Sequence, residues 1–252
     1  MIWYESGGHG SRTALLLHGL GATAAVWKPL AQGLAERGTL RWLAADLGGH
    51  GGSDWQSFYS VGQLATQLAE LVQQQNPGEL FIVGHSLGAY VGLALASGWF
   101  GLAVRGVLGI GPKINWPAED LQVARELASR AVRWYPTEEE AWTRCRRVSG
   151  LSPDIAPGQE WLARGAVQGE GGWRLAQDPR TFAVAGAPFA SLAASATIPI
   201  VLARGERDPM VSLQELRLHT QQAHDIRGAG HNAHIEKPAA VTELLEQLVA
   251  GG

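Results

Sequence analysis

Residues 81–96 read FIVGHSLGAYVGLALA, and this stretch limits the possible folds more than any other part of the chain. Phe81, Ile82 and Val83 form a short apolar, β-prone run, whereas Ser86–Ala96 is small and apolar at helical spacing. The chain is therefore expected to pass from a buried strand to a buried helix within one tight turn, with Ser86 at the corner.

The same alternation runs through most of the chain. Buried strands are predicted at residues 13–17, 40–45, 80–83, 104–110 and 198–203, and the run HDI at 224–226 is a candidate last strand. Helices are predicted at residues 25–36, 61–75, 86–97, 212–221 and 238–250. This pattern predicts an α/β fold with a mostly parallel central sheet flanked by helices.

Residues 113–195 interrupt the alternation. Two segments there, ARELASRAVRWY and EEEAWTRCRRV, have a helical pattern, and strand-like sequence resumes only after them. We therefore expect a helical lid at 113–195, inserted into a single core domain formed by 1–112 and 196–252.

Composition and charge exclude several classes of function. The 252-residue chain has a net charge of −3 and no block of like charge, so we expect no nucleic-acid partner. It has neither a basic and apolar leader nor a run of about 18 apolar residues, which predicts a cytoplasmic protein with no membrane association. The one cysteine, Cys145, excludes an intrachain disulfide and a CxxC metal site, and an incidental helix residue is the favoured interpretation.

The segment Gly84-His85-Ser86-Leu87-Gly88 matches the pattern Gly-x-Ser-x-Gly. Glycines two residues on either side of the serine let neighbouring backbone approach a sharp strand-to-helix turn without a Cβ clash. The helix that begins here directs its free N–H groups toward negative charge beside Ser86. Ser86 is thus a candidate nucleophile that needs a base to take its proton, and the alternative is a plain turn serine.

Four motifs occur in a fixed order: His18-Gly19-Leu20-Gly21, DLGGHGGS at residues 46–53, the turn at Ser86, and a late acid and histidine. Over essentially its whole length the chain resembles the α/β-hydrolase superfamily. The resemblance implies the α/β-hydrolase fold and the chain order nucleophile, acid, histidine. It also implies an oxyanion hole formed by the backbone N–H groups of Leu20 and Leu87.

The resemblance selects Asp208 as the acid and His231 as the base. Asp208 lies in GERD directly after the strand at 198–203; Glu206 is its local rival, and a loop or helix-capping aspartate is the other interpretation. His231 follows the glycine in GAGHNAH, with His234 as the competitor. Asp208 would hold the imidazole in one tautomer, and His231 would take the proton of Ser86.

No cofactor is expected. The glycine-rich segments GLGAT and GGHGGS fit neither a phosphate-binding loop nor a dinucleotide fingerprint. His231 and His234 are spaced i, i+3, but no HExxH or carboxylate–histidine cluster accompanies them, so we predict no metal site.

Aromatic residues predict an apolar substrate pocket, with Trp27, Lys113, Trp116, Trp134 and Trp142 as its candidate residues. For the tryptophans at helical spacing, the alternative is the lid's own core. Arginines in the first half of the lid either form a solvated helix face or bind an anionic substrate or acyl carrier; they are Arg125, Arg130, Arg133, Arg144, Arg146 and Arg147.

These features predict a serine hydrolase that cleaves carboxylic esters of small or medium acyl groups through an acyl-enzyme, with a small-molecule ester as its partner. A carbon–carbon bond enzyme is the first alternative, because GAGHNAH, GHGGS and GERD are similar to the menaquinone-pathway lyase of the superfamily. That lyase has a basic residue just after the serine turn, where this chain has Gly88-Ala89-Tyr90. The second alternative is a ligand-binding receptor on a hydrolase fold.

Overall fold

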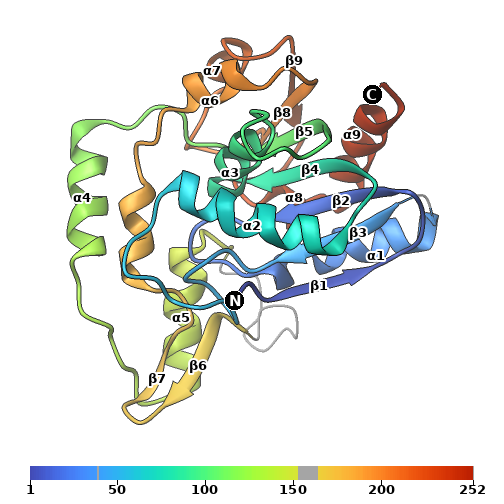
Figure 1. Ribbon diagram of the computed structural model, residues 1–252. Coiled ribbons are helices and arrows are strands. Elements are labelled where there is room, and N and C mark those ends of the chain that lie inside the picture. Colours follow the sequence, from blue (N-terminus) through green and yellow to red (C-terminus); the bar gives the residue numbers. More distant parts are fainter. Residues whose placement is uncertain (39, 153–163, 252) are drawn as a thin grey trace.

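The computed structural model describes residues 1–38, 40–152 and 164–251, and its centre is a sheet with the strand order β1-β3-β2-β4-β5-β8-β9 (Figure 1). The strands are β1 (Tyr4–Gly7), β2 (Arg12–Leu17), β3 (Arg41–Ala45), β4 (Glu79–His85), β5 (Val104–Ile110), β8 (Ile200–Gly205) and β9 (Gln222–Ile226). Neighbouring strands are parallel except for β1, which runs antiparallel to β3. The predicted α/β fold with a mostly parallel sheet is confirmed.

Helices cover both faces of the sheet, with α2 (Val61–Gln75) and α3 (Leu87–Leu95) on one and α1 (Lys28–Arg37) and α9 (Pro238–Gly251) on the other (Figure 1). Strand β2 shows why both faces are apolar. Leu15 and Leu17 pack into the core cluster that contains residues of α2 and α3, whereas Ala14 and Leu16 pack into the cluster of α1 and α9. Successive side chains of a strand point to opposite faces, so a doubly covered strand is apolar throughout.

Three core elements differ from the sequence predictions. Strand β1 lies at one edge of the sheet. It was not predicted, because its sequence YESG is short and contains no apolar run. Helix α7 (Leu213–Arg217) is shorter than the predicted helix at 212–221; it begins with a capping box between Ser212 and Glu215. Strand β9 contains the predicted run HDI but begins two residues earlier, and it is followed by the short helix α8 (Ala233–Glu236).

The segment between β5 and β8 contains more than helices. Its described elements are α4 (Ala118–Ala128), α5 (Glu138–Val148), β6 (Ala166–Gly169), β7 (Gly172–Leu175), the 3-10 helix η3 (Pro179–Val184) and α6 (Phe189–Ser195); residues 153–163 of the predicted lid lie outside the described part. Strands β6 and β7 form an antiparallel hairpin beside α5 (Figure 1), so the segment where a helical lid is predicted also holds a small two-stranded sheet. Helix α6 packs on α3, and Phe189 belongs to the main core cluster.

No helix in the described ranges is both long enough and apolar enough to cross a bilayer.

Candidate active site

Ser86 occupies a strained turn between β4 and α3. Its backbone has φ 49° and ψ −112°, and its N–H donates to the carbonyl of Ile110 at 2.8 Å, which ties the turn to β5. A Cβ on Gly84 would lie 2.3 Å from the carbonyl oxygen of Gly88, and a Cβ on Gly88 would lie 2.1 Å from that of Leu17. Both glycines are therefore required by the close approach of the backbone around Ser86.

Asp208 and His231 meet in loops that follow β8 and β9. His231 Nδ1 lies 2.9 Å from Asp208 Oδ2, and the Asp208 side chain is fully buried while 13% of the His231 side chain is exposed. The other carboxylate oxygen of Asp208 accepts the N–H of Met210 at 2.9 Å. A carboxylate so placed holds a proton on Nδ1 of the imidazole and leaves Nε2 to accept another.

Neither of the two rival residues is placed as the acid or the base of this pair. Glu206 is exposed and accepts the N–H of Gly228 at 2.8 Å, so its carboxylate closes the turn after β9. His234 is fully buried in α8. Across the described chain, no group of three or more His, Cys, Asp and Glu side chains is placed to hold a metal ion.

A row of neighbouring rings, each tilted against the next, lies behind His231. His85 lies 4.7 Å from the His231 ring and 4.4 Å from the His234 ring, and Trp27 lies 4.5 Å from His234. His85 Nε2 also donates to the backbone carbonyl of His231 at 3.0 Å. Burial lowers the pKa of His234 to about 3 and that of His85 well below its usual value, so both rings are neutral at pH 7. Sequence reasoning did not assign His85 this contact, since it depends on a loop far away in the chain.

The HGLG loop is held by a neutral histidine. His18 Nδ1 donates to the carbonyl of Gly19 at 2.7 Å, and His18 Nε2 accepts the N–H of Leu47 at 2.9 Å. Burial lowers the pKa of His18 to about 4, so the ring is neutral at pH 7. Its two hydrogen bonds place the one ring proton on Nδ1. Leu20 in this loop and Leu87 at the start of α3 both line the cavity beside Ser86, and the first N–H groups of a helix lack partners within the helix.

The DLGGHGGS motif at residues 46–53 contacts the segment that contains the HGLG loop. The buried carboxylate of Asp46 accepts the N–H of Ala24 at 2.6 Å and the N–H of Gly52 at 2.8 Å. The ring of His50 lies 5.1 Å from that of His18, and burial lowers the His50 pKa to about 3. The motif thus has a structural role, because it joins the segment after β2 to the segment after β3.

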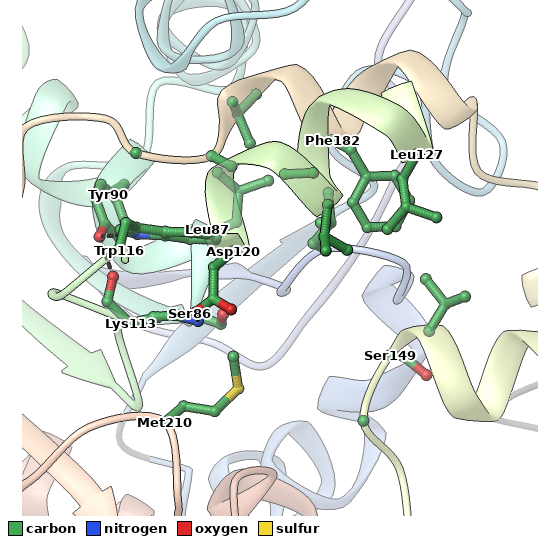
Figure 2. A pocket seen from close by; sticks show the side chains of 18 of the residues that line it. Ser86, Leu87, Tyr90, Lys113, Trp116, Asp120, Leu127, Ser149, Phe182 and Met210 are labelled. Atoms are coloured by element: carbon green, nitrogen blue, oxygen red, sulfur yellow. Dashed lines mark hydrogen bonds and ion pairs between the residues drawn. The ribbon is translucent and has the colours of Figure 1, made fainter. Parts of the chain in front are cut away.

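A cavity of about 290 Å³ opens beside Ser86 and His231 (Figure 2). One face of α4 contributes residues at the spacing i, i+3, i+4 and i+7, namely Asp120, Val123, Ala124 and Leu127. Phe182, Val184 and Met210 add further apolar surface. The lining residues of α4 were not predicted, although their apolar positions have the spacing of one helix face.

Of the five residues predicted for the substrate pocket, Lys113 and Trp116 line this cavity. Lys113 forms an ion pair with Asp120, and its ammonium lies 4.7 Å above the Trp116 ring. Trp116 Nε1 donates to the hydroxyl of Tyr90 at 3.3 Å, and this hydroxyl donates to the Lys113 carbonyl. The positive charge of Lys113 is therefore already paired within the cavity.

The predictions for the other three tryptophans are wrong. Trp27 is fully buried in the core at the end of the row of rings. Trp142 packs in the small core of the β5–β8 segment with Cys145, whose pKa burial raises to about 12, so this thiol is no nucleophile at neutral pH. Trp134 is 41% exposed and packs over the turn of the β6–β7 hairpin.

Comparison with known proteins gives consistent matches. A family model described as alpha/beta hydrolase family matches residues 14–244. The 2-(acetamidomethylene)succinate hydrolase of Mesorhizobium japonicum is 28% identical over 93% of this chain and 87% of its own length. Esterase Rv0045c of Mycobacterium tuberculosis is 28% identical over 92% of this chain and 80% of its own length. A crystal structure of E-2-(acetamidomethylene)succinate hydrolase has a TM-score of 0.82 at 22% identity, covering 98% of this chain and 94% of that one.

Two shorter matches are 36% and 34% identical, each over about a third of this chain. The chain in turn spans only 5% and 34% of the length of those two proteins. The family model, in contrast, covers most of the chain, residues 14–244. The chain therefore belongs to the alpha/beta hydrolase family.

Proposed function

We propose that this hydrolase cleaves carboxylic esters of small or medium acyl groups, with Ser86 as nucleophile, His231 as general base and Asp208 as its partner. One observation carries the proposal. His231 Nδ1 lies 2.9 Å from Asp208 Oδ2, and His231 lines the same cavity as Ser86, whose backbone is strained. The esterase relative supports the same class of reaction.

The reaction follows from the positions of these groups. The Ser86 oxygen attacks the carbonyl carbon of the ester, and its proton passes to Nε2 of His231. The resulting oxyanion accepts hydrogen bonds from the N–H groups of Leu20 and Leu87. Collapse expels the alcohol, which takes the proton from His231; a water molecule then repeats the sequence and releases the acid.

The cavity indicates the kind of acyl group. Its volume of about 290 Å³ and its largely apolar lining suit a short or medium aliphatic chain. Phe182 and Leu127 close the side of the cavity opposite Tyr90 and Trp116 (Figure 2), so acyl chains that reach these side chains are expected to react fastest.

The experiment is hydrolysis of a p-nitrophenyl ester series from acetate to octanoate by the wild type, Ser86→Ala and Asp208→Asn. We expect multiple turnovers in the wild type and a loss of about 10³-fold or more in each variant. Glu206→Gln is the matched control, because this neighbouring carboxylate accepts the N–H of Gly228 and does not contact His231. This variant should retain activity. Full activity in a folded Ser86→Ala protein would refute the proposal.

The same assay separates the alternatives. A single slow labelling of Ser86 without turnover would favour a ligand-binding receptor. A folded wild type that neither turns over nor is labelled would favour the carbon–carbon bond enzyme.

A further inference from the structure

A second cavity, of about 170 Å³, lies beside the first and shares Leu127, Val148 and Phe182 with it. Figure 2 shows Leu127 and Phe182 together on the side of the first cavity that faces away from Tyr90 and Trp116. The shared residues form one apolar wall between the two spaces. To reach the second cavity, a substrate bound at Ser86 would have to extend past this wall.

The residues that line the second cavity include three arginines, Arg130, Arg133 and Arg144, and no Asp or Glu is among its described lining residues. None of the three arginines forms an ion pair with a described residue, although the Arg133 guanidinium lies 5.0 Å over the ring of Tyr135. Glu140, one turn before Arg144 on α5, does not line the cavity. The positive charge of this cavity is therefore available to a ligand.

Charge is arranged differently in the first cavity. Its lysine, Lys113, is paired with Asp120, and its other lining residues on α4 are apolar. An anionic group close to the bond that is cleaved would therefore meet a cation that already has a partner. The same group beyond the shared wall would meet unpaired guanidinium groups.

We propose that the second cavity binds an anionic group of the substrate, a carboxylate or a phosphate, at the end remote from the bond cleaved at Ser86. Arg130 follows Leu127 by three residues and Arg144 precedes Val148 by one helical turn, so both arginines adjoin the shared wall. A guanidinium binds carboxylate and phosphate oxygens through paired hydrogen bonds. The inference rests on the proposed function and adds the substrate class, which is an anionic ester or thioester.

The test compares p-nitrophenyl octanoate with the mono-p-nitrophenyl ester of octanedioic acid, which differs by a terminal carboxylate. We expect kcat/KM of the wild type to favour the anionic ester by about tenfold, since each exposed ion pair contributes about two- to fivefold. Arg130→Gln and Arg144→Gln should each lower this ratio by about two- to fivefold. Arg125→Gln and Arg147→Gln are matched controls on α4 and α5 that do not line either cavity, and they should leave the ratio unchanged.

A second pair of substrates distinguishes the two sources of the anion. Octanoyl-coenzyme A carries phosphates on its leaving group, whereas octanoyl-N-acetylcysteamine is the neutral thioester of the same acid. A preference for the coenzyme A thioester that is lost in Arg144→Gln assigns the anion to the leaving group, and a preference confined to the octanedioic ester assigns it to the acyl group. Equal rates within both pairs would overturn the inference.

Binding measurements keep this inference separate from the proposed function. Octanedioate, octanoate and coenzyme A are titrated into the wild type and into Arg144→Gln by calorimetry, which needs no turnover. Tighter binding of octanedioate or coenzyme A than of octanoate, lost in the variant, supports the anion site even if every ester is left intact. Hydrolysis of neutral esters with no such difference in binding would refute the anion site and leave the proposed function standing.

Discussion

Replacement of Ser86 by glycine is expected to stabilise the fold relative to replacement by alanine, although both variants lose the nucleophile. Ser86 has φ 49° and ψ −112°, a region that residues with a Cβ occupy at a cost of about 1–3 kcal/mol. Glycine enters this region freely, but its greater freedom in the unfolded chain costs about 0.5–1 kcal/mol. The difference predicts a free energy of unfolding about 1 kcal/mol higher for Ser86→Gly than for Ser86→Ala, which keeps the Cβ and therefore the strain.

The two variants are compared by urea unfolding and by thermal unfolding, both followed by circular dichroism. A difference of about 1 kcal/mol corresponds to about 2–4 °C in Tm for a chain of this size. Ala190→Gly, at an exposed position of α6, is the control for glycine in an ordinary helical conformation, and it should lower the stability by about 0.5–1 kcal/mol. If Ser86→Gly proved no more stable than Ser86→Ala, the turn would not be strained and the reasoning would fail.

Two further predictions concern the supports of the site. Gly88→Ala should lower the free energy of unfolding by about 3 kcal/mol, because the new Cβ would lie 2.1 Å from the Leu17 carbonyl oxygen. Gly62→Ala should not destabilise, because its Cβ would make only an ordinary contact, 4.0 Å from the Ser60 hydroxyl oxygen, and equal Tm values for the two variants would contradict this reasoning. Burial lowers the pKa of His18 to about 4 and of His50 to about 3, below the unfolded value of about 6.5. The contribution of these two rings to stability is complete above about pH 6.5 and is lost as the pH falls toward 4, so together they lose about 2 kcal/mol between pH 7 and pH 5.5, and the buried His85 and His234 add to this loss. In urea unfolding, His50→Gln should therefore lose about 1 kcal/mol less than the wild type over this interval, and an unchanged slope would count against the assignment.

The sequence alone was sufficient for the fold and for the order of the motifs. Ser86, Asp208 and His231 each follow a strand-like segment, and the carboxyl ends of parallel strands meet at one edge of a sheet. The structure brings Asp208 and His231 into contact there and places Ser86 and His231 at one cavity. These predictions depend on local patterns, which are strong wherever a strand is buried on both faces.

The tertiary structure alone decided which aromatic side chains reach the cavity. Apolar spacing shows which residues share a helix face, but it does not show what that face packs against, so Trp27 and Trp142 could not be separated from Trp116. Strand β1 exists because it pairs with β3, since its own sequence carries no apolar run. The contact of His85 with the His231 carbonyl joins residues 146 positions apart. Such contacts depend on how distant loops pack together, and no short-range pattern in the chain determines that packing.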